Sequence, residues 1–195
     1  MKGYLVLEDG TVFDGMPFGF SKDVIGEVVF STGMTGYQES LTDPSYCGQI
    51  LVSAYPLIGN YGVNRTDSQS SKVQVWGYAV REACDLPSHR DSEQGIGAFL
   101  RGHGVPGIQG IDTRELIRKI RDSGTMMGGI TAGDPGEMLE RVRRARRPEP
   151  QAPARGGGEA RQVGPVPEVL LESPEPPASG GEGRPEPAGE PIGDP

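Results

Sequence analysis

Hydrophobic and polar positions alternate most clearly at the start of the chain, where residues 4–15 read YLVLEDGTVFDG. Two runs typical of β-strands flank Asp9-Gly10, a dipeptide that favours a tight hairpin turn with positive φ at both central positions. Five further segments rich in β-branched and aromatic residues predict strands at 27–31, 49–55, 72–80, 107–111 and 127–131.

Capping residues predict three helices in the second half of the chain. Asp91 would cap a helix that presents Ile96, Phe99 and Leu100 and stops at Gly102. The other two are expected at 112–124, where Asp112 and Glu115 form a capping box, and from Asp134-Pro135 to 147. Strands in the first half and helices in the second predict a mixed α/β fold, a layered β/β/α domain rather than a regular alternation of strands and helices.

Composition divides the chain at about residue 147. Residues 148–195 hold 12 Pro and 9 Gly but no aromatic residue, Lys, His or Cys. So little apolar bulk cannot offset the entropy lost on ordering, which predicts a disordered tail at 148–195 behind one folded domain at 1–147. The tail carries 9 of the 27 acidic residues and 3 of the 19 basic ones, so most of the net charge of −8 belongs to it.

The sequence shows no clear pattern for nucleic-acid binding, membrane insertion or dinucleotide binding. Five arginines between 141 and 147 lie at the end of a predicted helix, where cations suit the helix dipole, and no aromatic residue interleaves with them, so nucleic-acid binding is not expected. No apolar run has the roughly 20 residues of a membrane span and no signal peptide is recognisable, which predicts a cytoplasmic protein with reduced thiols. GHGVPG at 102–107 follows a predicted helix instead of a strand, so it is interpreted as a helix end and turn, not a dinucleotide fingerprint.

The cysteines and histidines do not form a recognisable catalytic or metal-binding pattern. Cys47 and Cys84, with His89 and His103 as the only imidazoles, lack the surroundings of an activated thiolate, and both cysteines are interpreted as packing residues. Two histidines without Cys or carboxylate at ligand spacing predict no metal site.

The segment GEVVFSTGMTGYQESLTDPSY at 26–46 begins as a strand and continues as a long polar stretch without the periodicity of a helix. One interpretation is a structural loop, in which glycines supply unusual φ and Asp43-Pro44-Ser45 makes a turn. The other is a functional loop, in which Ser45 and neighbouring amides present hydrogen-bonding groups to a small polar ligand or a partner surface. The residues alone leave both interpretations open.

A family resemblance favours the second interpretation. It rests on five motifs in order, LVLEDGTVFDG, GEVVFSTGMTGYQESLTDPSYCGQI, YPLIGNYGVN, GVPGIQGIDTRELIRKIRDSGTMMGGI and AGD. Together they closely resemble the N-terminal domain of the small chain of glutamine-dependent carbamoyl phosphate synthetase, over residues 3 to about 145.

The resemblance implies a layered β/β/α fold and a function divided between domains and chains. In this family a C-terminal amidotransferase domain with a Cys-His-Glu triad hydrolyses glutamine. The ammonia passes to a large chain that uses ATP and a divalent metal to make carbamoyl phosphate for arginine and pyrimidine synthesis. The N-terminal domain docks the large chain and lends one serine to the glutamine pocket, which is Ser45 here. The docking residues expected in this chain are Met34, Tyr37, Gln38 and Glu39, and alanine at Tyr37 should weaken the complex without unfolding the domain.

The sequence departs from the family after RVRRA at 141–145, because no nucleophile cysteine, histidine or acid of the triad follows. The chain is therefore expected to hold no catalytic residue, to bind no cofactor itself and to release no ammonia from glutamine alone. The alternative hypothesis is a non-catalytic interaction module that binds the large chain or another partner.

The tail consists almost wholly of Arg, Pro, Gly, Ala, Glu, Ser, Val and Leu, a composition typical of a GC-rich gene read out of frame. A shift of reading frame near codon 146 therefore predicts that one of the other two frames downstream encodes an amidotransferase domain. Sequencing the DNA for a few hundred bases beyond that codon checks it, and the hypothesis fails if neither frame encodes one.

Overall fold

The computed structural model describes residues 2–145. The strands are β1 Gly3–Leu7, β2 Val12–Gly19, β3 Val24–Ser31, β4 Gln49–Ser53, β5 Leu57–Ile58, β6 Gly77–Ala79, β7 Glu82–Ala83, β8 Pro106–Gln109 and β9 Met126–Thr131. The helices are α1 Tyr37–Thr42, α2 Ile96–Gly102, α3 Thr113–Ser123 and α4 Pro135–Arg144, with one 3₁₀ turn, η1 Pro44–Tyr46. The predicted domain boundary at 147, the tail at 148–195, Arg146 and Arg147 lie outside the described residues.

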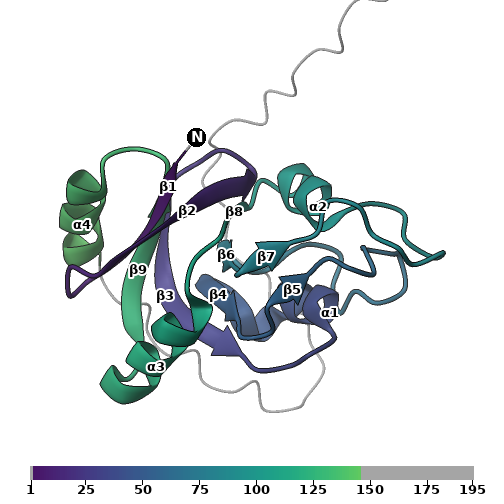
Figure 1. The fold of residues 1–195 in the computed structure, drawn as a ribbon, viewed down its shortest axis with the longest axis horizontal. Helices are drawn as coiled ribbons and strands as arrows, with labels where there is room; N and C mark the ends of the chain where they lie inside the picture. Colours follow the sequence, from purple (N-terminus) through teal and green to yellow (C-terminus); the bar gives the residue numbers. More distant parts are fainter. Residues whose placement is uncertain (1, 146–195) are drawn as a thin grey trace, which may run out of the picture. The chain divides into compact units, whose positions relative to one another are not determined.

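Seven strands close into a barrel in the order β1-β2-β8-β6-β4-β3-β9, and β9 returns to pair with β1 (Figure 1). The pairs β3–β4, β4–β6 and β6–β8 are parallel and the other barrel pairs are antiparallel. The mixed α/β class is thus confirmed. The β-layers are not separate sheets, because the strands form one closed wall with helices outside it; β5 and β7 form a small pair of their own.

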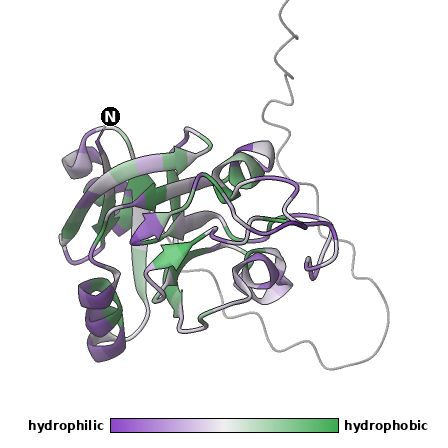
Figure 2. Cartoon of the chain, turned by 45° about the vertical axis from the view of Figure 1, so that its right-hand side comes forward, coloured by the Kyte–Doolittle hydropathy of each residue, from purple (hydrophilic) through white to green (hydrophobic). Residues whose placement is uncertain are grey.

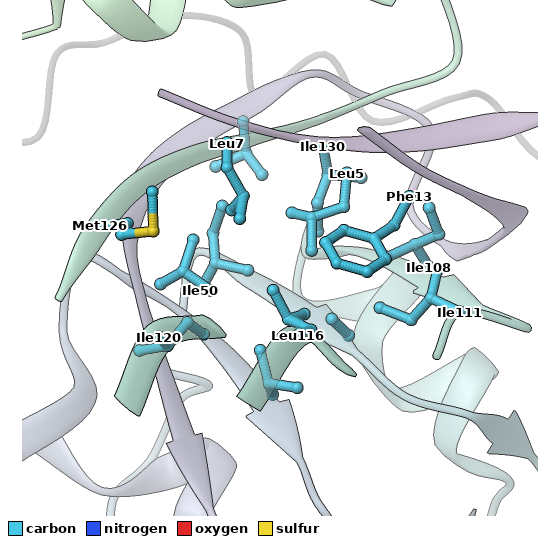
Figure 3. Packing of buried hydrophobic residues seen from close by; sticks show 14 residues of the cluster. Leu5, Leu7, Phe13, Ile50, Ile108, Ile111, Leu116, Ile120, Met126 and Ile130 are labelled. Atoms are coloured by element: carbon cyan, nitrogen blue, oxygen red, sulfur yellow. The ribbon is translucent and has the colours of Figure 1, made fainter. Parts of the chain in front are cut away.

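The inside of the barrel is filled by the alternate side chains that face inward from each strand (Figure 3). Leu5, Phe13, Ile50, Ile108 and Ile130 point toward one another from five different strands. Figure 2 shows hydrophobic colour on the strands and the strongest hydrophilic colour on outer helices and loops.

Helix α3 contributes to this same core, since Leu116 and Ile120 are buried with the strand residues. The predicted cap of α3 is confirmed, because the Asp112 carboxylate accepts the Glu115 N–H at 2.9 Å and Gly124 ends the helix with φ of 82°. The cap thus stabilises the start of α3, and the buried side chains of the helix hold it against the core.

Helix α4 covers β1 and β9 from outside, with Met138 and Val142 buried against Val6 and Met127. Its predicted start is also confirmed, because Asp134 accepts the Glu137 N–H at 2.9 Å and Pro135 takes the first helical position.

Strand β9 has two adjacent glycines that make this packing possible. A Cβ on Gly128 would collide with Val28 and one on Gly129 with Met138, so the barrel core and α4 approach the same backbone from opposite sides. Glycine in a strand commonly marks such a close approach.

The first hairpin differs from its prediction. The Leu7 N–H donates to the Thr11 carbonyl and the Gly10 N–H to the Leu7 carbonyl, so the loop has three residues, 8–10, and not two. Gly10 has φ of 96°, and this geometry is that of a type I turn followed by a bulge.

The predicted helix start at Asp91 is wrong. Helix α2 begins at Ile96 after Gly95, although Ile96, Phe99 and Leu100 are buried as expected. The strand predicted at 72–80 is reduced to β6 at 77–79. Before it, the Gln74 N–H donates to the Leu41 carbonyl of α1, and the Trp76 N–H donates to the carbonyl of Gln49, the first residue of β4.

The arginines of α4 each have a contact. Arg141 pairs with Asp23, Arg143 donates to the Glu8 carbonyl, and Arg144 lies 3.6 Å from Glu140.

No helix among residues 2–145 has the length and apolar character to cross a membrane.

The Asp9–Lys119 ion pair joins the first hairpin to α3, with Nζ and Oδ2 2.7 Å apart and both side chains about one third exposed. Burial alone would raise the pKa of Asp9, but hydrogen bonds from Lys119 and Thr11 outweigh it and hold that pKa below its ordinary value. A group with a lowered folded pKa stabilises the fold above its unfolded pKa, and this contribution is lost as the pH falls through the folded pKa.

Asp9→Asn should therefore lower the free energy of unfolding at pH 7, by less than about 1 kcal/mol because the pair is partly exposed. The difference from the parent should shrink as the pH falls below about 4, since the parent carboxylate then also becomes neutral. Urea unfolding at pH 7, 5 and 3.5 measures this. Lys119→Gln should cost the same at pH 7 and add nothing to Asp9→Asn, whereas additive losses would contradict the pairing.

Candidate functional site

The polar stretch predicted as a loop connects the parallel strands β3 and β4. Parallel neighbours cannot be joined by a tight hairpin, so the chain between Ser31 and Gln49 has to cross back along the molecule. It does so through α1 and then η1, at the right of Figure 1. The expectation that this stretch contains no helix is therefore wrong.

The start of α1 is held by a tyrosine from another segment. Gly36 takes the N-cap position with φ of 80° and offers no side chain to cap the helix. The Tyr61 hydroxyl accepts the N–H groups of Gly36 and Tyr37 at 2.8 and 3.3 Å, and the rings of Tyr37 and Tyr61 stack with centroids 4.2 Å apart. The first turn of α1 thus depends on a residue more than twenty positions away.

Gln38 fixes the middle of α1 to the same neighbouring segment. Its side chain is 1 % exposed. The amide nitrogen donates to the Asn64 carbonyl at 2.6 Å and to the Ser68 hydroxyl at 2.9 Å, and its oxygen accepts the Asn64 N–H at 3.0 Å. This satisfies both ends of a buried amide, so Gln38 serves as a clamp.

The end of α1 is anchored at Thr42. The Thr42 hydroxyl donates to the Gln38 carbonyl at 2.8 Å and accepts the Gln69 N–H at 2.9 Å. The Ser70 hydroxyl donates to the Thr42 carbonyl at 2.6 Å. All of α1 is therefore tied by hydrogen bonds to residues 61–70.

Burial raises the pKa of the Tyr37 hydroxyl, because a phenolate there would be desolvated. Its O–H donates to the Gly62 carbonyl at 2.6 Å, which requires the protonated form. Burial likewise raises the pKa of Tyr61, although its two backbone hydrogen bonds oppose the shift. Neither hydroxyl is poised to exchange a proton near neutral pH, so their role is structural.

Ser45 lies in η1, directly after α1, and its side chain is exposed. The Asp43 carboxylate accepts the Ser45 N–H at 2.8 Å, and Pro44 occupies the first position of the turn. The backbone of Ser45 is thus fixed, while its hydroxyl makes no hydrogen bond to the residues that the structure describes. The half-exposed ring of Trp76 lies beside Gly48, at the end of the same connection.

The four residues predicted to dock a partner are not equally accessible. Met34 is 72 % exposed, and Glu39 is half-buried. Tyr37 is 5 % exposed and packs among the apolar residues of α1, α2 and β4, and Gln38 is also buried. Met34 and Glu39 can meet a partner directly, whereas Tyr37 and Gln38 hold the connection in place.

The described residues contain no nucleophile with an activating base. Cys47 is exposed, contrary to the expectation of a buried packing residue, and Cys84 is half-buried with its thiol 3.3 Å from the Leu86 carbonyl. His103 contacts the Phe99 carbonyl, and His89 lies beside Asp91. No group of three His, Cys, Asp or Glu among residues 2–145 could hold a metal ion.

The fold and this geometry together define a mixed α/β barrel domain that presents a clamped polar connection at its surface. The family model for the carbamoyl-phosphate synthase small chain, CPSase domain, matches residues 5–130. The chain belongs to this family.

Curated relatives agree with this assignment. The chain is 56 % identical over 131 residues to the carbamoyl phosphate synthase small chain of Caldanaerobacter subterraneus, a match covering 67 % of this chain and 37 % of the relative. It is 54 % identical to the small chain of Archaeoglobus fulgidus over 134 residues, 69 % of this chain and 37 % of that one. It is 51 % identical to the pyrimidine-specific small chain of Bacillus subtilis over 142 residues, 73 % and 38 % of the two chains. The chain thus spans well under half the length of these relatives.

Sequence reasoning missed the residues that position the connection. Tyr61 and Asn64 lie within the motif YPLIGNYGVN, which indicated the family. Nothing in this motif indicated that the two residues hold α1. Sequence reasoning also missed an arginine series on α3 at 114, 118 and 121, although its helical spacing was readable from the sequence.

From the sequence, alanine at Tyr37 was expected to weaken the complex without unfolding the domain. Because Tyr37 is buried, a loss of stability is expected instead. Tyr37→Ala should lower the free energy of unfolding by about 3–5 kcal/mol, because a buried ring is removed. Tyr37→Phe should cost about 1–3 kcal/mol, since the Gly62 carbonyl loses its donor. Met34→Ala, at an exposed position, should stay within about 0.5 kcal/mol of the parent. Chemical denaturation measures all three, and a Tyr37→Ala variant as stable as Met34→Ala would refute the structural role.

Proposed function

We propose that this chain is the docking part of the glutamine-hydrolysing small subunit of carbamoyl phosphate synthetase. The whole small subunit would release ammonia from glutamine and supply it to a large subunit in the cytoplasm. That large subunit would use ATP and a divalent metal to make carbamoyl phosphate. The observation that carries the proposal is the family match over residues 5–130.

In this proposal Ser45 contributes to the glutamine pocket of an amidotransferase domain. An exposed serine on a fixed turn suits the role, because its hydroxyl can donate to one polar end of a substrate and accept from another. The clamp on α1 supports the proposal further, since it reduces the ordering that a ligand would otherwise have to impose. Ser45 would be a binding residue, and the bond-breaking groups would lie in the other domain.

The chain itself would release no ammonia from glutamine. Attack on the amide carbon needs an activated nucleophile and donors for the developing oxyanion. Cys47 has no imidazole partner among residues 2–145, and the triad is not recognisable after residue 145. In this proposal the chain binds no cofactor itself and acts through its contacts.

A non-catalytic interaction module is the second candidate, favoured by the exposure of Met34 and Trp76 on and beside the connection. Apolar side chains exposed on a fixed connection are available to pack against a partner. This module would bind the large chain or another partner, and it differs from the first candidate in that Ser45 takes no part in glutamine use.

The purified chain should form a complex with the large chain of the same organism and release no ammonia from glutamine above a protein-free blank. Size-exclusion chromatography with light scattering detects the complex, and an enzyme-coupled ammonia assay measures the hydrolysis. Ammonia release by the chain alone would overturn the assignment of the chemistry to another domain. Absence of a complex would overturn the docking role.

Ser45 is tested in a chimera that joins residues 1–145 to the amidotransferase domain of a curated relative. With the large chain, Ser45→Ala should raise the KM for glutamine several-fold while the rate with added ammonia stays unchanged. Ser40→Ala, a serine that bonds only within α1, is the matched control. An unchanged KM in Ser45→Ala would favour the interaction module.

A further inference from the structure

One face of α3 carries three arginines around an isoleucine. Arg114, Arg118 and Arg121 are exposed, and their spacing places them with Ile117 on one side of the helix. These four residues and Ala54 line an open hollow of about 440 Å³. The hollow is therefore lined by three arginines and two apolar side chains.

The charge of this face is not neutralised within the described part of the chain. No carboxylate of residues 2–145 pairs with Arg114 or Arg118, and Arg121 has only the exposed side chain of its neighbour Asp122, 3.5 Å away. By contrast, Lys119 on the flank of the same helix is paired with Asp9. Like charges at this spacing destabilise a helix slightly, so the series disfavours α3 unless something else compensates it.

The hollow lies beside the start of the connection between β3 and β4. Ala54 directly follows β4, and its N–H donates to the carbonyl of Ser31, the last residue of β3. Helix α3 contacts both strands, below the barrel in Figure 1. The arginine face and the exposed Met34 therefore belong to the same end of the barrel.

Ser45 belongs to the opposite end of β4. It precedes the strand, whereas Ala54 follows it, and the five residues of β4 span roughly 16 Å at about 3.3 Å per residue. The arginine face therefore does not include Ser45.

We propose that the arginine face of α3 (Arg114, Ile117, Arg118 and Arg121) docks an acidic patch of the large chain. This inference rests on the proposed function, and it names the chemistry of the contact. Carboxylates of the partner would pair with the arginines, and an apolar side chain would cover Ile117. Arginine around a small apolar centre is typical of protein interfaces.

A small anion is a poorer match for the same face. Sites for small anions enclose their charge with buried donors, which strengthens each contact. All three arginines here are exposed, and the hollow holds no buried charged side chain. An extended acidic surface can instead engage them together.

Charge reversal in the full chain tests the docking. Arg118→Glu should weaken binding to the large chain by about tenfold or more, and Arg118→Gln by about threefold. Because the introduced carboxylate could pair with Arg114 and Arg121, α3 itself should not weaken. Arg90→Glu is the matched control, since Arg90 is 91 % exposed in a loop far along the chain from α3 and its only ion-pair partner among residues 2–145 is the neighbouring Asp91. Affinities come from biolayer interferometry at about 50 and 300 mM NaCl, with thermal unfolding as a fold check.

The inference predicts that the parent and Arg90→Glu lose affinity steeply with salt, while Arg118→Glu binds weakly and with a flatter salt dependence. If Arg118→Glu binds as the parent does, this inference is wrong and the proposed docking function stands. If the parent does not bind the large chain at all, both fall. If Arg118→Glu changes only the self-association of the chain, seen by sedimentation velocity, the face serves a second copy and the inference is again wrong.

Discussion

The parallel pairing of β3 with β4 is the constraint on which the arrangement of this domain depends. Residues 27–31 and 49–53 pair side by side in the same direction, so the chain between them must return over the outside of the barrel. A hairpin at this point would have left no surface segment to carry α1 and η1. The polar connection is therefore a consequence of strand direction, and its sequence adapts it to a surface role.

Because the connection is polar, it cannot be held by apolar packing alone. Tyr61, Gln38 and Thr42 supply hydrogen bonds that tie α1 to residues 61–70, and Tyr37 adds a stacked ring. No buried side-chain nitrogen or oxygen among residues 2–145 is left without a partner. A fully satisfied polar network of this kind rigidifies the structure, whereas a partly satisfied one would destabilise it.

The sequence predicted best those structural features that depend on residues close together in the chain. The caps at Asp112 and Asp134 are confirmed because each depends on a carboxylate three residues from its donor. Helix α1 was missed because Gly36 gives no capping signal and the partner that replaces one, Tyr61, is distant in the sequence. For the same reason Tyr37 was expected on the surface: its burial depends on α2 and β4, which no local pattern reveals. The residues alone named Ser45 only as one of several polar groups in the connection, and its expected role in a glutamine pocket came from the family resemblance.

Strand β9 shows where the wall of the barrel is thinnest. Gly128 and Gly129 give it no side-chain bulk on either face, so Met138 and Val142 of α4 complete the barrier between the core and water. The family match ends at residue 130, and α4, which covers this strand, lies beyond that residue. A dissection that cut the chain at the end of β9 would expose its backbone to solvent, and the barrel would lose its outer seal.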